Sequence, residues 1–166
     1  MPATRDNTHR EQEIERKFLV SREPEGLARH PHHRIRQGYL AIASDGSEVR
    51  IRQLDDRHFL TCKGPGTLSR RELETEVSKD QFETLWPATE GCRVEKIRYK
   101  IGHGDGLIEL DVFQACHEGL LLAEIEFDSE AASARFRPPD WFGEEVTNDK
   151  RYKNQQLARH GIPRKE

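Results

Sequence analysis

Charged and apolar residues alternate along a series of short runs, and this alternation limits the fold more than any other feature of the sequence. In the first run, Glu13, Glu15 and Lys17 alternate with Ile14 and Phe18. Successive side chains of a β-strand point to opposite faces, so each such run predicts a strand with one charged face and one apolar face. The pattern recurs at Arg50 and Arg52, at Glu72, Glu74 and Glu76, at Lys96, Arg98 and Lys100, at Glu109 and Asp111, and at Glu124 and Glu126.

Turn sequences separate many of these runs. Ser-Asp-Gly occupies residues 44–46, Gly-Pro-Gly residues 64–66 and His-Gly-Asp-Gly residues 103–106. Short strands joined by hairpin-sized gaps predict a mainly β protein built as an antiparallel sheet or barrel. The predicted strands are residues 13–20, 36–43, 47–53, 58–63, 72–77, 95–101, 106–113 and 121–127.

Three helices are predicted between and after the strands. Ser78 starts a capping-box sequence, and Asp128 or Ser129 is placed to cap a second, short helix. Thr147 is the predicted cap of a last helix, which we expect to stop at Gly161 because glycine favours helix ends. The sequence is therefore α+β in detail, with the helices outside the strand-rich part.

Composition narrows the classes of function. Charged residues make up 34% of the chain, above the roughly 25% of an average protein. The net charge of −3 argues against nucleic-acid binding, which usually needs a basic surface. Cys62, Cys92 and Cys116 form no CxxC pair, so we expect free thiols in the cytoplasm. No apolar run approaches the roughly 20 residues needed to span a bilayer, so we expect no membrane partner. We expect residues 1–10 to be a flexible leader and residues 11–166 to form a single domain.

The charged faces admit two interpretations. They are either solvated outer surfaces with interleaved ion pairs, or they line an enclosed space within a closed sheet. Enclosed like charges are costly unless something neutralises them. Metal ions would neutralise the carboxylates and a polyanion would neutralise the cations, so the second interpretation predicts a metal–polyphosphate site.

The first run, Glu-Ile-Glu-Arg-Lys at residues 13–17, resembles the ExExK signature of the CYTH superfamily, the triphosphate tunnel metalloenzymes. Arg50-Ile51-Arg52, Lys63 before its Gly-Pro-Gly turn, and the later K-x-R and acidic strands follow in the order typical of that family. The resemblance implies an eight-stranded antiparallel closed β-barrel with outer helices and a C-terminal helix near one mouth. It is greatest to small bacterial members that hydrolyse inorganic tripolyphosphate.

The same resemblance implies a bound Mg²⁺ or Mn²⁺, cations that prefer carboxylate and phosphate oxygens. The implied ligands are paired carboxylates at i, i+2 spacing: Glu13, Glu15, Glu124 and Glu126. Three further acidic residues are either additional metal ligands or groups that orient the cations across the barrel: Glu74, Glu76 and Asp111.

A row of cations is implied as the phosphate clamp, because arginine and lysine bind phosphate oxygens. Its members are Lys17, Arg50, Arg52, Lys63, Arg70, Lys96 and Arg98, with Lys150 and Arg151 as additions that a solvated helix face explains equally well. For catalysis we expect Lys96 to orient the attacking water. Tyr39 is a candidate partner for Lys17, although a tyrosine that only packs in the barrel is the alternative.

The resulting hypothesis is a metal-dependent tripolyphosphatase with weaker activity on nucleoside triphosphates. The alternatives are a class IV adenylyl cyclase, a thiamine triphosphatase and a non-catalytic polyphosphate-binding module. The expected partner is a small triphosphate, with no nucleic acid and no membrane, and the expected assembly is a monomer or a homodimer.

Overall fold

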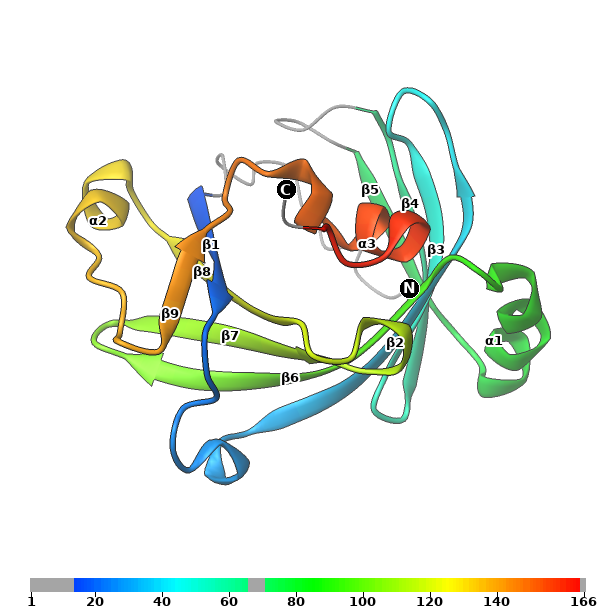
Figure 1. Ribbon diagram of the computed structural model, residues 1–166. Helices are drawn as coiled ribbons and strands as arrows, with labels where there is room; N and C mark the ends of the chain where they lie inside the picture. The colour runs from blue at the N-terminus through cyan, green and yellow to red at the C-terminus, as the bar shows by residue number, and fades with distance from the viewer. Residues whose placement is uncertain (1–13, 66–70, 165–166) are drawn as a thin grey trace, which may run out of the picture.

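A single antiparallel sheet of nine strands dominates the computed structural model, which describes residues 14–65 and 71–164 (Figure 1). The predicted leader, residues 1–10, and the site candidates Glu13 and Arg70 lie outside the described residues. The sheet order is β5-β4-β3-β2-β6-β7-β8-β1-β9. The strands are β1 (Ile14–Val20), β2 (His32–Ile42), β3 (Glu48–Leu54), β4 (Arg57–Lys63), β5 (Glu72–Val77), β6 (Arg93–His103), β7 (Gly106–Phe113), β8 (Leu121–Phe127) and β9 (Phe142–Glu145).

The sheet is open, so the prediction of a closed eight-stranded barrel is wrong. Within the described ranges, β5 and β9 each pair with a single neighbour and form the two edges. The unpredicted ninth strand pairs with β1 through Phe18↔Glu145 and Val20↔Phe142. Its four residues, Phe-Gly-Glu-Glu, lack a run of alternation, and the pairing partner is far away in the chain. The eight predicted strands are all present, although β2 and β6 begin earlier than expected.

The helices are short, and none of those described is long and apolar enough to cross a bilayer. Ser78 caps α1 (Lys79–Leu85) with the predicted capping box, and Ser129 caps α2 (Glu130–Arg135). Gly161 ends α3 (Asn154–His160) with a positive φ of 75°. The remaining turns are 3-10 helices: η1 (Leu27–Arg29), η2 (Trp86–Thr89), η3 (Ala115–His117) and η4 (Lys150–Tyr152).

Thr147 does not cap the last helix, contrary to the prediction. Its hydroxyl accepts a hydrogen bond from the Lys17 backbone N–H at 3.0 Å and donates to Glu145 at 2.8 Å. The threonine is thereby used to hold β1 beside β9. Asp149 caps η4 instead, by accepting from the backbone N–H of Arg151, and α3 begins five residues after that cap.

The apolar face of the sheet packs against the outer helices. On one part, Ile51 of β3 is fully buried with Phe82 of α1 and Trp86 of η2. On another, Ile108 of β7 and Ile125 of β8 lie in a second cluster that extends to the segments around α2. Each Å² of apolar surface that is buried contributes about 25 cal/mol, so these contacts are the main source of stability. They also fix which face of each strand packs against the helices.

The opposite face changes character along its strands. Part of it is apolar and is covered by α3, whose Leu157 is fully buried in a cluster with Val94, Phe113 and Leu122. The rest carries the charged residues of the alternating runs. The C-terminal helix therefore covers part of the face that holds the charged groups, and Figure 1 shows α3 between the β1–β9 and β3–β5 regions of the sheet.

Candidate active site

The strand register places the charged residues of neighbouring strands on one face. Arg98 of β6 lies opposite Asp111 of β7, and Glu109 of β7 lies opposite Glu124 of β8. Glu124 in turn lies opposite Lys17 of β1. Residues that face each other across an antiparallel pair have their side chains on the same side of the sheet. The alternation in the sequence thus becomes a continuous charged surface across β6, β7, β8 and β1, which we call the paired half.

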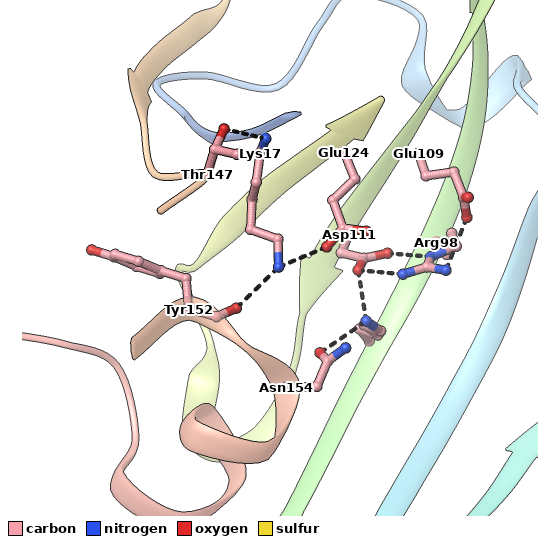
Figure 2. A network of polar contacts seen from close by, with 9 residues as sticks. Lys17, Arg98, Glu109, Asp111, Glu124, Thr147, Tyr152 and Asn154 are labelled. Atoms are coloured by element: carbon pink, nitrogen blue, oxygen red, sulfur yellow. Dashed lines mark hydrogen bonds and ion pairs between the residues drawn. The ribbon is translucent and has the colours of Figure 1, made fainter. Parts of the chain in front are cut away.

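Asp111 holds two cations at the centre of the paired half (Figure 2). Its Oδ2 lies 2.6 Å from Lys96 Nζ, and its Oδ1 accepts from Arg98 Nε at 2.7 Å. The side chains of Lys96 and Asp111 are only 3% and 4% exposed. Burial alone would raise the pKa of Asp111, but the two cations outweigh it and hold that pKa at about 2. Asp111 is consequently a fixed anion that anchors both cations.

The two cations respond differently to this environment. Burial lowers the pKa of the Lys96 ammonium, and the attraction of Asp111 offsets only part of the effect. Burial also acts on Arg98, but Asp111 and Glu109 prevail and raise its pKa above the ordinary value. Arg98 therefore remains a permanent charge, whereas Lys96 is the cation of the pair whose proton is held less tightly.

Lys17 occupies a second ion pair in the paired half. Its Nζ lies 2.9 Å from Glu124 Oε1 and donates to the backbone carbonyl of Tyr152 at 3.4 Å (Figure 2). Arg98 Nη1 likewise lies 2.9 Å from Glu109 Oε2. Short contacts to carboxylates of the same face thus orient the cations of this half.

The remaining cations of the predicted clamp lie on β3 and β4: Arg50, Arg52 and Lys63. We call this face of strands β2 to β5 the cationic half. Arg50 lies 3.9 Å from Glu48, Arg52 lies 3.7 Å from Glu74, and the pairing of Lys63 with Glu72 is 3.6 Å. The buried Nε atoms of Arg50 and Arg52 have no hydrogen-bond acceptor among the described residues. Burial, followed by the like charge of Arg50, lowers the pKa of Arg52. An anion with several oxygens would accept hydrogen bonds from these Nε–H groups and would stabilise the charged form of Arg52.

Tyr39 does not lie with Lys17, so the proposed pairing of these residues is wrong. The Tyr39 hydroxyl accepts from Gln37 Nε2 at 2.8 Å. Burial and then the charge of Glu48 raise its pKa above the ordinary value of 10. The pairing failed because β2 lies between β3 and β6, whereas the neighbours of β1 are β8 and β9.

Carboxylates suited to a divalent cation meet where β1 and β8 pair. Glu15 lies directly opposite Glu126, and Glu124 follows two residues away on the same face. No group of three His, Cys, Asp or Glu side chains within residues 14–65 and 71–164 is close enough to hold a metal by itself. Mg²⁺ commonly takes one or two carboxylates and completes its shell with phosphate oxygens and water. The donors at this position fit that mode of binding.

The other acidic candidates are engaged elsewhere. Glu74 accepts from the Thr61 hydroxyl at 2.8 Å, and Glu76 forms a two-pronged pair with Arg57 at 3.1 and 3.0 Å. Both glutamates lie on the edge strand β5. Together with the role of Asp111, these contacts favour the interpretation in which the three residues orient cations.

The two additional cations of the C-terminal segment are exposed. Lys150 lies at the start of η4. The guanidinium of Arg151 pairs with Asp149 of the same turn at 2.7 Å. Lys150 and Arg151 therefore differ from the buried and half-buried cations on the strands.

Four polar residues of this face were not among the predicted site residues. Glu48 and Gln37 are almost fully buried, Glu109 pairs with Arg98, and Asn154 accepts from Lys96 at 3.1 Å. Glu109 had a signal, since it is in phase with Asp111 along its strand. Asn154 had none, because its position depends on how the C-terminal segment packs across the sheet.

Comparison with known proteins adds independent findings. The CYTH domain family matches residues 11–161. An inorganic triphosphatase of Nitrosomonas europaea is 55% identical over 148 residues, which cover 88% of this chain and 96% of that protein. An inorganic triphosphatase of Acetivibrio thermocellus is 41% identical over 151 residues, 89% and 94% of the two chains. A crystal structure of an inorganic triphosphatase superposes with a TM-score of 0.79 at 49% identity, covering 93% of this chain and 99% of the other.

Proposed function

Because this chain belongs to the CYTH domain family, we propose that it is a hydrolase that cleaves inorganic tripolyphosphate into pyrophosphate and phosphate on the charged face of its sheet. The observation that carries the proposal is the cationic half. There Arg50 and Arg52 are partly desolvated, lie 3.9 and 3.7 Å from their glutamate partners, and have buried Nε–H groups without acceptors in the described part of the chain. A short polyphosphate supplies several acceptor oxygens and negative charge along such a row.

The clamp that we propose spans both halves of the face. Arg50 and Arg52 form bidentate contacts to phosphate, because the guanidinium fork matches two phosphate oxygens. Lysines add charge at the flanks. The complete set is Lys17, Arg50, Arg52, Lys63, Lys96 and Arg98, with Arg70 as a further member outside the described residues.

For the metal, we propose that one or two carboxylates at a time from Glu15, Glu124 and Glu126 hold Mg²⁺ or Mn²⁺, with phosphate oxygens and water completing the shell. Glu13, which precedes the described part of β1, is the remaining candidate. Such a cation, when bound, neutralises phosphate charge and favours ionisation of a bound water. Asp111 remains outside this set, because both of its oxygens are engaged by Lys96 and Arg98. Glu74 and Glu76 act by holding cations of the other half.

Hydrolysis requires a water aligned with the terminal phosphorus. The oxygen of the water forms a bond to that phosphorus and the water gives up a proton to the solvent. The bond to the bridging oxygen breaks, and pyrophosphate leaves with the bonding electrons. Lys96 is the group that we propose to orient the water, since its ammonium is fixed by Asp111. Lys17 and Arg98 stabilise the charge that develops on the phosphate oxygens. Tyr39 and Gln37 support the Arg50 side of the clamp rather than Lys17.

Phosphate release from several substrates tests the proposal. The purified protein is assayed with Mg²⁺ or Mn²⁺ against tripolyphosphate, ATP and thiamine triphosphate in parallel. We expect turnover of tripolyphosphate far above that of the other two, and none after chelation of the metal. Cyclic AMP from ATP, preference for thiamine triphosphate, or tight binding without turnover would each replace the proposal by the corresponding alternative.

Two variants connect the assay to the metal site. Glu15→Ala and Glu126→Ala should abolish turnover and leave the circular dichroism spectrum unchanged, because both side chains are exposed and carry no core packing. Unchanged activity in either variant would remove that residue from the metal site.

Location and assembly are further parts of the proposal. The free thiols of Cys62, Cys92 and Cys116 support a cytoplasmic location. We propose a monomer or homodimer that acts on a small triphosphate without nucleic acid or membrane, which gel filtration and fractionation of cells test directly.

A further inference from the structure

The C-terminal segment contributes an acceptor to each of two lysines of the proposed phosphate clamp. The carbonyl of Tyr152 accepts from Lys17 Nζ at 3.4 Å, and Asn154 Oδ1 accepts from Lys96 Nζ at 3.1 Å. Each lysine also has one carboxylate partner, Glu124 or Asp111. An ammonium group carries three N–H donors, so the two contacts at each lysine leave one donor for a ligand.

Lys96 is the more tightly surrounded of the two lysines. Its Nζ lies 2.6 Å from Asp111, 3.1 Å from Asn154 and 5.2 Å from the centre of the Phe113 ring. These neighbours come from two different parts of the fold, the strand β7 and the helix α3. Asp111 engages one N–H of the ammonium, and the second acceptor further restricts rotation of the ammonium about the Cε–Nζ bond.

The helix that supplies Asn154 is itself firmly held. Leu157, one turn further along α3, is fully buried in the cluster with Val94 and Phe113. Its backbone carbonyl accepts from Nε2 of His117, at a distance of 2.6 Å, and His117 is almost fully buried in η3. Asn154 is therefore presented by a packed element rather than by a free chain end.

We propose that Asn154 is a positioning residue that orients the ammonium of Lys96 so that its remaining N–H points to the reacting water or phosphate oxygen. The inference rests on the proposed triphosphatase function and adds a residue to it. A neutral amide suits this task, because Asp111 already supplies a negative charge. A second carboxylate would offset the positive charge of Lys96 and weaken its attraction to a phosphate oxygen.

Asn154→Leu tests the inference, because leucine has a similar size and lacks the acceptor. We expect the kcat for tripolyphosphate to fall about tenfold or more, the usual effect of losing one hydrogen bond to a charged group, with a smaller change in KM. Asn154→Asp restores an acceptor, so it should recover kcat relative to the leucine variant and raise KM through its charge. The matched control is Gln155→Leu on the same helix. The Gln155 side chain accepts a hydrogen bond from the neighbouring Gln156, so this variant should behave as wild type.

A second measurement reads the position of Lys96 without turnover. The ¹H–¹⁵N spectrum of the lysine ammonium groups, assigned by loss of a signal in Lys96→Arg, should show the Lys96 signal displaced or broadened in Asn154→Leu and unchanged in Gln155→Leu. Equal kcat values and equal Lys96 signals in these two variants would overturn the inference. A wild-type protein that cleaves no triphosphate would instead overturn the proposed function, while the spectrum still decides whether Asn154 orients Lys96.

Discussion

The paired half and the cationic half of the same face differ in how closely carboxylates pair with their buried or partly buried cations. In the paired half, Lys96 and Arg98 lie 2.6 and 2.7 Å from Asp111. In the cationic half, Arg50 and Arg52 lie 3.9 and 3.7 Å from their nearest glutamates. In the first region, close carboxylates neutralise the positive charges of Lys96 and Arg98. In the second region, the positive charges of Arg50 and Arg52 are only weakly compensated by the more distant glutamates. A binding site for a polyanion requires such positive charge.

The largest effect should come from removing the anion of the paired half. Asp111→Asn removes the carboxylate that pairs with buried Lys96 and one of the two that pair with Arg98. Breaking a buried pair in this way costs about 3–5 kcal/mol of unfolding free energy. Urea unfolding measures the loss. The control Glu109→Gln lies two residues away on the same strand, where Glu109 pairs with Arg98 and is about one-third exposed. It should cost about 1 kcal/mol or less, and equal losses in both variants would contradict the central role of Asp111.

Removing a cation of the cationic half should have the opposite sign for stability. Arg52→Met deletes a charge that burial penalises and that Glu74 compensates only at long range. We expect the free energy of unfolding to stay constant or rise by about 1 kcal/mol. The KM for tripolyphosphate should rise about tenfold or more, because a charged contact to phosphate is lost. A loss of stability like that of Asp111→Asn would show that the two halves do not differ as described.

Acid should weaken the paired half specifically. The pKa of Asp111 is about 2 in the folded protein against an ordinary value of 3.8. The unfolded chain therefore binds the proton first, and the stabilisation is complete above pH 4 and is lost as the pH falls toward 2. The difference corresponds to about 2 kcal/mol. Unfolding experiments between pH 5 and 2 should show the gap between wild type and Asp111→Asn narrowing, whereas a constant gap would refute this assignment of the pKa.

The smallest effect is expected at the exposed edge of the cationic half. Glu76 pairs with Arg57 at 3.0 Å, but both side chains are more than half exposed. Water and salt screen such a pair, so Glu76→Gln should leave unfolding free energy and turnover unchanged within error. A clear loss of turnover would return Glu76 to the list of metal ligands.

The sequence predicted what local periodicity can encode. Alternation assigned Lys17, Lys96, Arg98 and Glu124 to one face, and the strand register places them there. Capping chemistry at Ser78 was equally local and was predicted correctly. The mainly β class followed from the number of such runs.

What the sequence did not reveal depends on contacts between distant segments. A period of two says which face a residue occupies and leaves the neighbour of each strand undetermined. Pairing Tyr39 with Lys17 and closing the sheet therefore both failed. The strand β9 exists because β1 offers it hydrogen bonds, and Asn154 reaches Lys96 because α3 packs on Leu122 and Phe113.

Calorimetric titration with tripolyphosphate in the absence of divalent metal tests the central claim most directly, because it reports the attraction of the cationic half without turnover. Three proteins are compared: wild type, Arg52→Met, and Arg57→Met as a control whose largely exposed side chain lies at the end of the neighbouring strand β4. We predict similar affinities for wild type and Arg57→Met, and binding to Arg52→Met that is about tenfold weaker or more. Equal affinities in all three proteins would contradict the account, since the polyphosphate would then bind somewhere other than the charged face.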